Sequence, residues 1–242
     1  NMQQKTRFRS ADNVIEEIEL MMDKYNCRHF RFLDDNAIID KKRFQVLAPK
    51  LHDLDIRFRG SISSVLVNPE YCELLYYAGC REVGIGFEAA DDDILKLMNK
   101  AGKATTNMHA EAIRMIQKSG MKAKIYIISG LPGETEETIE ATKRFVKELK
   151  PDKWIVTLFT PYPGTPIFRN PEAFGVEILH KRFREYFPSH PSKAVINIKG
   201  ATADVLEKRF NDLISWLNVH SKDQYNKGIS EVSDHFEYSS MY

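Results

Sequence analysis

Cysteine, long apolar runs and an excess of charge are all scarce in this sequence. Its 242 residues contain three cysteines, Cys27, Cys72 and Cys80, too far apart and odd in number for a disulfide framework, which favours reduced thiols in a cytoplasm. The apolar runs fall far short of the roughly 20 residues that cross a bilayer, and the first residues lack the apolar region of a signal peptide. A formal net charge of +1 gives no bias toward nucleic acid or an anionic membrane. The sequence therefore predicts a neutral, soluble, cytoplasmic domain with neither of these partners.

Several catalytic and metal-binding motifs are missing as well. The seven histidines form no pair at the spacing of metal ligands, and the sequence has neither a nucleophile elbow nor a Walker loop. Gly84 and Gly86 match a loose dinucleotide fingerprint, but they lie within a predicted strand. Glu88 and the acidic residues after it would also repel a pyrophosphate at the following helix. We therefore expect no nicotinamide site.

A repeated unit dominates what is present: an apolar strand-like run, a polar or glycine-containing turn, and an amphipathic helix. Strands separated by helices pair in parallel with right-handed crossovers, so the turns that follow the strands gather at one end of the sheet. Ser10, Asp40 and Asn68 precede helical patterns as expected caps. The pattern predicts an α/β fold, with too few units to close an eight-stranded barrel. The five strand-like runs are His29–Leu33, Ile56–Arg59, Val83–Phe87, Ala123–Ile128 and Trp154–Phe159.

The rhythm of strand and helix fails from about Phe174 onward. One further helix is expected at Ala203–Val219, and the last segment is expected to be loosely ordered. We therefore predict two domains, a βα domain over residues 1–170 and a partly helical extension over residues 171–242.

Charged residues lie at or just after the ends of three predicted strands. Asp34 and Asp35 come directly after the first strand, and a carboxylate there can hold an ammonium group. Arg59, in the second strand, can bind a carboxylate, and Glu88, after the third, can hold the vicinal hydroxyls of a ribose. Each of these charges could equally be solvated or belong to a salt bridge. Their placement at successive strand ends favours a site for an amino-acid nucleoside.

The two last turns are shaped by glycine and proline. Gly130 at the end of a strand removes the side chain where a flat ligand can lie against the backbone. The alternative is a plain strand-to-helix turn capped by Thr135. The loop that contains Pro161 and Tyr162 has three prolines, which stiffen it as the wall of an adenine site or as a simple connection.

Four motifs in order resemble the radical S-adenosylmethionine (SAM) superfamily, and most closely its branch that often carries an N-terminal cobalamin-binding domain. The resemblance covers about residues 5 to 168. The motifs are Phe32–Asn36 with Asp40–Arg43, Ala78–Glu88 with Met98–Lys100, Ile128–Thr135, and Thr160–Pro166.

The resemblance implies a partial (βα)6 TIM-like barrel, here with five βα units and without the first strand, and SAM lying across the strand ends. Asp34 or Asp35 would then contact the methionine amino group and Arg59 its carboxylate. Glu88 would contact the ribose. Gly130 and the loop at Pro161 and Tyr162 would contact the adenine.

One departure from the family concerns its 4Fe-4S cluster, which is bound by three cysteines in a C-x3-C-x2-C loop. This sequence has no such triad, and we expect Cys27, Cys72 and Cys80 to be small buried residues instead of ligands. No metal-ligating residue is therefore expected in this chain. We expect it to be the C-terminal part of a longer enzyme whose upstream domain supplies the cluster ligands, and to be inactive alone.

By this resemblance the function is that of a radical SAM enzyme that uses a 4Fe-4S cluster to generate a 5'-deoxyadenosyl radical, acting on a small-molecule or peptide substrate. With cobalamin, methyl transfer to carbon is the expected outcome. The alternatives are oxidative cyclisation, rearrangement or methylthiolation, and, from another class, a cluster-less scaffold or binding subunit.

Overall fold

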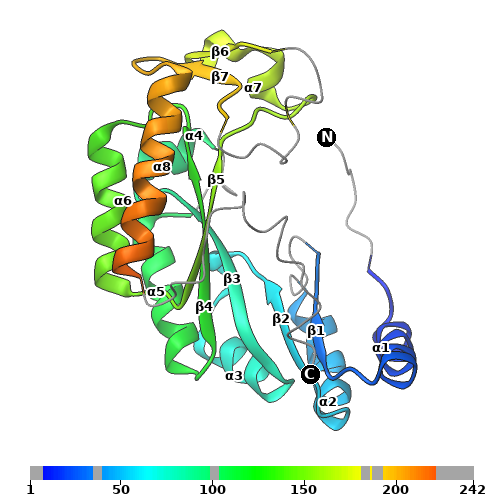
Figure 1. Ribbon diagram of the computed structural model, residues 1–242. Coiled ribbons are helices and arrows are strands. Elements are labelled where there is room, and N and C mark those ends of the chain that lie inside the picture. The colour runs from blue at the N-terminus through cyan, green and yellow to red at the C-terminus, as the bar shows by residue number, and fades with distance from the viewer. Residues whose placement is uncertain (1–7, 35–39, 99–103, 181–185, 187–192, 222–242) are drawn as a thin grey trace. The chain divides into compact units, whose positions relative to one another are not determined.

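The computed structural model describes residues 8–34, 40–98, 104–180, 186 and 193–221 (Figure 1). By its contacts the chain divides into two compact units. The described part of unit 1 consists of Phe87–Thr106 and the chain beyond Ile125. Unit 2 consists of the chain up to Gly86 together with Asn107–Lys124. The limits predicted for the βα domain and its extension stay a prediction.

All five predicted strands are present, and they form one sheet in the order β1-β2-β3-β4-β5. The pairing of β1 with β2 and of β2 with β3 is parallel, as expected for strands joined through helices. The third strand is longer than predicted because Cys80–Glu82 continue it at its start. The strands are β1 (His29–Arg31), β2 (Arg57–Ser61), β3 (Cys80–Glu88), β4 (Lys122–Ser129) and β5 (Lys153–Leu158).

The helices of unit 2 begin where their capping residues predict. The side chains of Ser10 and Asp40 each accept a hydrogen bond from a backbone N–H three residues later, at 3.1 Å, and Asn68 does so at 2.9 Å. These bonds satisfy amides that the first helical turn leaves without a partner. The elements are α1 (Ala11–Tyr25), α2 (Lys41–Asp53), the 3-10 turn η1 (Ser64–Leu66), α3 (Pro69–Tyr77) and α5 (Thr106–Lys118).

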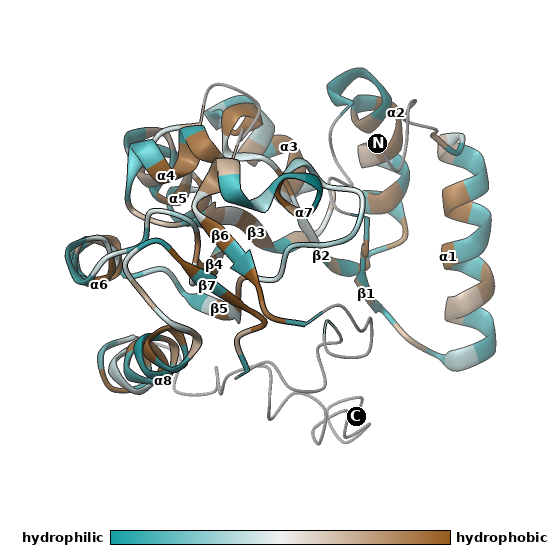
Figure 2. Cartoon of the chain, turned by 90° about the horizontal axis from the view of Figure 1, so that it is seen from above, coloured by the Kyte–Doolittle hydropathy of each residue, from teal (hydrophilic) through white to brown (hydrophobic). Residues whose placement is uncertain are grey.

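Unit 1 contains the predicted C-terminal helix, α8 (Ala203–His220), which lies beside α6 (Glu136–Leu149); both have a hydrophobic and a hydrophilic side (Figure 2). A short antiparallel pair, β6 (Val176–Ile178) and β7 (Ile196–Ile198), lies beyond Phe174, where the sequence pattern loses its rhythm and predicts irregular structure before the last helix. That expectation was wrong because three-residue strands carry too little alternation to be recognised. The remaining elements are α4 (Asp92–Leu97), α7 (Pro166–Arg169) and η2 (Pro171–Phe174).

The strands bury one face and leave the other partly open. In β2 of unit 2, Phe58 is 3% exposed whereas the next residue, Arg59, is exposed, and in β3 Val83 and Ile85 are fully buried. In unit 1, Trp154 and Val156 are fully buried in the same alternating way. The face opposite to these buried side chains carries polar residues such as Arg59. Among the described helices, none combines the length and the apolar character needed to cross a membrane.

Candidate functional site

Glu88 ends β3 in a tight turn of unit 1. The N–H of Ala89 donates to the carbonyl oxygen of Phe87 at 3.0 Å, and Glu88 between them has φ +66°. Such a φ is uncommon for a residue with a side chain, and it persists only where the surroundings enforce it. Here Phe87 stacks on Phe145 of α6, with ring centroids 4.3 Å apart, and the hydroxyl of Thr142 accepts the N–H of Ala90 at 3.2 Å. The strand end is thereby fixed with the Glu88 side chain largely buried.

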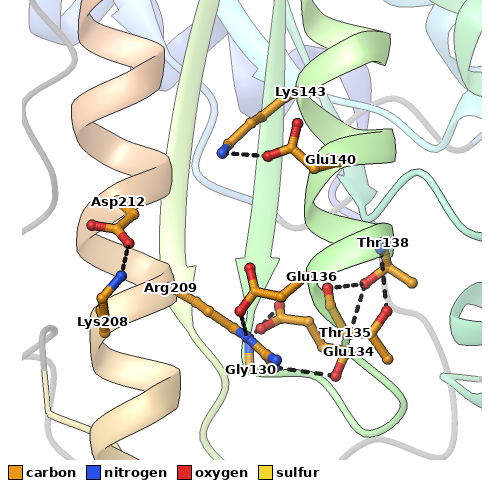
Figure 3. A network of polar contacts seen from close by, with 10 residues as sticks. All are labelled: Gly130, Glu134, Thr135, Glu136, Thr138, Glu140, Lys143, Lys208, Arg209 and Asp212. Atoms are coloured by element: carbon orange, nitrogen blue, oxygen red, sulfur yellow. Dashed lines mark hydrogen bonds and ion pairs between the residues drawn. The ribbon is translucent and has the colours of Figure 1, made fainter.

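Gly130 follows β4 and adopts a backbone conformation that other residues avoid. Its φ is +82°, and a Cβ atom built there would lie 3.3 Å from Leu158 Cδ1 and 3.7 Å from Leu206 Cδ1. Its N–H donates to Glu134 Oε2 at 2.7 Å, while the N–H of Glu134 donates to the carbonyl oxygen of Leu131 at 2.9 Å (Figure 3). The turn from Gly130 to Glu134 is therefore closed by hydrogen bonds in both directions.

Glu134 is a buried carboxyl group inside this turn. Burial raises its pKa to about 7, although the Gly130 amide, Arg209 and the Ser129 hydroxyl each act in the opposite direction. Its second oxygen, Oε1, and Ser129 Oγ are both buried without a hydrogen bond of regular geometry. Glu134 therefore holds a proton over a wider pH range than a solvated glutamate does.

Arg209 of α8 connects the C-terminal helix to the same turn. Its Nε lies 2.8 Å from Glu136 Oε1, and an Nη1 hydrogen bond of 3.3 Å reaches the carbonyl oxygen of Glu134 (Figure 3). The side chain of Arg209 is only 12% exposed, so this contact is shielded from solvent more than a typical surface ion pair. The extension therefore helps to hold the turn after β4.

The loop with Pro161 and Tyr162 begins at a neighbouring strand end. The N–H of Phe159, just after β5, donates to the carbonyl oxygen of Ser129 at 2.7 Å, which ties the start of this loop to the Gly130 turn. Pro161 is buried, and Tyr162 is 52% exposed. The hydroxyl of Thr165 donates to the carbonyl oxygen of Tyr162 at 2.7 Å and fixes the bend before α7. A partly exposed aromatic ring thus belongs to a rigid loop.

Unit 2 contains the other predicted site residues. Asp34 is exposed after β1, and Asp35 lies outside the described residues. In β2, Arg59 has its Nη1 3.8 Å from Glu82 Oε1 of β3. The alternative of a salt bridge is therefore observed for Arg59, although 47% of its side chain remains exposed.

The predicted residues thus fall into two groups, Glu88, Gly130, Pro161 and Tyr162 in unit 1, and Asp34 and Arg59 in unit 2. Their ligand contacts stay predictions. The alternative interpretation of the Gly130 turn, a strand-to-helix turn capped by Thr135, is also supported, because Thr135 and Thr138 form a reciprocal capping box at the start of α6.

Two residues that hold the turn were not predicted: the sequence pattern assigned no role to Glu134 or Arg209. Glu134 directly follows Gly133 in a recognised motif, whereas nothing in the sequence marks Arg209.

The three cysteines do not fit an iron–sulfur cluster. Cys72 in α3 and Cys80 in β3 are buried, and burial raises the pKa of their thiols to about 11 and about 12, whereas cluster ligation needs thiolates. Both are confirmed as small buried residues. The prediction of burial was wrong for Cys27, which is only partly buried, with its Sγ 3.6 Å from the carbonyl oxygen of Met21. Within the described ranges, no group of three or more His, Cys, Asp or Glu is placed to hold a metal ion.

Comparison with known proteins connects these features to a family. The sequence profile of the radical SAM superfamily matches residues 1–146. The chain belongs to this superfamily. Its five strands and their helices have the partial TIM-like barrel fold that the sequence predicts. A solved structure of the radical SAM methyltransferase TsrM from Kitasatospora setae has the same fold, with a TM-score of 0.61 and 20% identity over 70% of this chain and 36% of that one.

Two of the curated relatives are a methyltransferase and a cyclase. Bacteriochlorophyllide d C-12(1)-methyltransferase of Chlorobaculum tepidum is 32% identical over 76% of this radical SAM chain and 40% of its own length. The anaerobic magnesium-protoporphyrin IX monomethyl ester cyclase of Cereibacter sphaeroides is 28% identical over 67% of this chain and 27% of its own. The chain spans about two fifths of the first curated relatives it matches.

Proposed function

We propose that this chain is the SAM-binding part of a radical SAM enzyme that methylates carbon with the help of cobalamin. The similarity to the methyltransferase of Chlorobaculum tepidum supports the reaction type. TsrM, the neighbour of similar fold, is a methyltransferase solved with cobalamin and a [4Fe-4S] cluster bound. The cytoplasm is the proposed location because the buried thiols of Cys72 and Cys80 are free.

The observation that carries the proposal is the glycine turn after β4. Adenine is flat and largely apolar, and a Cβ atom at Gly130 would meet Leu158, Leu206 and Phe159 within 4 Å, so the glycine belongs to a closely packed apolar turn against which we propose the base to lie. The turn itself is held by Glu134 and Arg209, so a ligand does not have to order it. Tyr162, in the loop that starts at the neighbouring strand end, supplies an exposed ring next to which a base can stack.

Glu88 is the proposed ribose contact in the same unit. A carboxylate accepts hydrogen bonds from two vicinal hydroxyls, and the enforced turn at Glu88 keeps it at the end of the strand. Contacts of Asp34 or Asp35 with the methionine amine and of Arg59 with its carboxylate remain predictions for unit 2. In this proposal the residues of the chain bind and orient SAM and exclude water from it.

The cluster belongs to the proposed enzyme but not to the cysteines of this chain. Cys72 and Cys80 are poor candidates for iron ligands, because burial raises the pKa of both thiols and a ligand must be a thiolate. We therefore propose that three cysteines outside this chain, from an N-terminal domain of the same protein, supply the ligands. When bound, the cluster would provide the electron that cleaves SAM.

Oxidative cyclisation is the second candidate, favoured by the similarity to the cyclase of Cereibacter sphaeroides. The two reactions are separated by incubating the complete protein, reconstituted anaerobically with iron, sulfide and cobalamin, with SAM labelled in its methyl group and candidate substrates. Label in the product supports methylation, and a product without label supports cyclisation. A complete protein that takes up no cluster on reconstitution supports the cluster-less scaffold alternative, and failure to cleave SAM in a preparation with a full cluster contradicts both enzyme reactions.

A further inference from the structure

A cavity of about 480 Å³ lies at the amino ends of β2 and β3, within unit 2. Among the residues that line it, Arg57 is the first residue of β2 and Arg81 the second of β3, while Tyr77 is the last residue of α3. Asp34, a predicted SAM contact, follows the opposite end of β1, and Arg59 does not line the cavity. The cavity is therefore separate from the SAM contacts predicted for this unit.

Two tyrosines form the aromatic part of the lining, and contacts within the chain hold both of them. The guanidinium carbon of Arg81 lies 4.1 Å from the centre of the Tyr76 ring, and a Cβ atom at Gly120 would lie 3.3 Å from Cε2 of that ring. The Tyr77 ring stacks on His52 with centroids 4.1 Å apart, and His52 Nδ1 donates to the carbonyl oxygen of Tyr77 at 2.9 Å. Tyr76 and Tyr77 nevertheless remain 42% and 46% exposed. A ligand therefore meets two rings that it does not have to order.

The two arginines of the cavity keep hydrogen-bond donors for a ligand. Toward the part of the chain that the structure describes, Arg81 uses only Nη1, which donates to two backbone carbonyl oxygens at 2.9 and 2.8 Å. Arg57 likewise uses only Nη1, which lies 3.0 Å from Asp55 Oδ1 and 3.0 Å from the carbonyl oxygen of Ile56. The Nε and Nη2 donors of both guanidinium groups are thus left for a further acceptor.

The formal charges of the lining cancel. With His52 counted as neutral, Arg57 and Arg81 are balanced by Asp55 and Glu73. An ionic ligand therefore gains no net attraction from the lining. The volume suits a small organic molecule, and exposed tyrosine rings favour one that is flat and aromatic.

We propose that this cavity binds a flat aromatic molecule without net charge, with its ring against Tyr76 and Tyr77 and a hydrogen-bond acceptor on the free donors of Arg57 and Arg81. It is a second ligand site of the chain, in addition to the predicted SAM contacts. The inference does not depend on the proposed function, because the cavity requires neither the cluster nor SAM.

The site is tested on the chain as it stands with three indole probes that differ in charge, namely indole-3-acetamide, indole-3-acetate and tryptamine. Cyclohexylacetamide, which has the amide group without a flat ring, is the control probe. Dissociation constants are measured by saturation-transfer NMR titration at low salt, and we expect indole-3-acetamide to bind most tightly of the four. Absence of its binding at millimolar concentration, equal binding of cyclohexylacetamide, or tighter binding of either ion overturns the proposal.

Variants of the aromatic lining locate the bound probe. Tyr77→Leu should weaken indole-3-acetamide about threefold to tenfold because a stacking partner is lost, whereas Tyr77→Phe keeps the ring and should bind like the original chain. Tyr25→Leu removes an exposed tyrosine of α1 and is the matched control, with no change expected. A loss in Tyr162→Leu and none in Tyr77→Leu would mean that the probe occupies the proposed adenine site, which overturns the inference.

A second pair of variants should produce gains, which a general loss of structure cannot do. Arg57→Gln leaves the lining with one negative charge in excess, so the binding of tryptamine relative to indole-3-acetamide should improve by about threefold to fivefold. Glu73→Gln leaves one positive charge in excess and should favour indole-3-acetate to a similar extent. Unchanged ratios in both variants would show that the probes do not meet this lining and would overturn the proposal. Since no cluster and no SAM is present, failure of the proposed function leaves these results intact.

Discussion

The N–H of Gly130 donates to Glu134 Oε2 at 2.7 Å, which joins the residue proposed to lie under adenine to a buried acid four positions later. The acid closes the turn and leaves no solvent between the two groups. Helix α8 reinforces the same turn through Arg209. The proposed adenine site is thus built by residues of β4, its following turn and the C-terminal extension together.

Replacing Glu134 by alanine should destabilise the chain by about 1–3 kcal/mol. The Gly130 amide would lose its partner in a buried position, and an unsatisfied buried donor carries the full cost of its desolvation. Urea unfolding at constant pH measures the change. Glu137→Ala, an exposed acid in the first turn of α6, is the matched control and should have a smaller effect. Equal losses in the two variants would show that the turn does not depend on Glu134.

The pH dependence of stability should carry the signature of Glu134. Its pKa is raised from 4.5 to about 7 in the folded chain, so the folded state holds a proton that the unfolded state has released. The contribution of protonated Glu134 to the free energy of unfolding is therefore complete below pH 4.5. It is lost as the pH rises through 7, a change of about 3 kcal/mol.

Glu134→Gln keeps an acceptor for Gly130 and does not titrate. As the pH rises from 5 to 8, the variant should therefore become more stable relative to the original chain, as measured by the free energy of unfolding. Urea titrations across that range provide the values. A difference that is flat with pH would mean that Glu134 is ionised throughout.

Gly130→Ala should destabilise more than Gly200→Ala. Both glycines have a positive φ, +82° and +90°, so the backbone strain of about 1 kcal/mol is shared. Only at Gly130 would the new methyl group meet a neighbour, Leu158 Cδ1 at 3.3 Å, whereas nothing lies within 4 Å at Gly200. Thermal unfolding of the two variants gives the comparison. If Gly200→Ala lost as much stability, the contact would be irrelevant.

Arg209→Ala should loosen the turn and shift the titration of Glu134. The variant removes the contacts with Glu136 and with the Glu134 carbonyl, at an expected cost of about 1–3 kcal/mol. Because Arg209 lowers the pKa of Glu134, its loss should raise that pKa further and move the pH-dependent window upward. The control is Lys208→Ala, an exposed neighbour on α8, for which no measurable change is expected.

The strands and most helices could be predicted because they follow local rules. Alternating burial marks β4 and β5, and a capping side chain marks the start of α1, α2 and α3. The pair of β6 and β7 could not, since its partners are short and separated in the chain by a segment with no pattern.

The sequence could indicate residues of the candidate site only where they lie at the end of a predicted strand. Glu88 and Gly130 fulfil that condition. Arg209 does not, because its contact with Glu134 joins residues 75 positions apart and depends on how α8 packs. The engagement of Arg59 by Glu82 follows from the register of β2 and β3, which includes an irregularity that no sequence pattern reveals.

The most direct test measures formation of 5'-deoxyadenosine by the complete reconstituted and reduced protein, compared with its Glu88→Gln and Glu137→Gln variants. We expect the unmodified protein and Glu137→Gln to form the product alike, and Glu88→Gln to form at least about tenfold less because a ribose contact to a charged acceptor is lost. Absence of 5'-deoxyadenosine from a protein with a full cluster, or equal amounts from the Glu88 variant, would contradict the proposed binding of SAM at these strand ends.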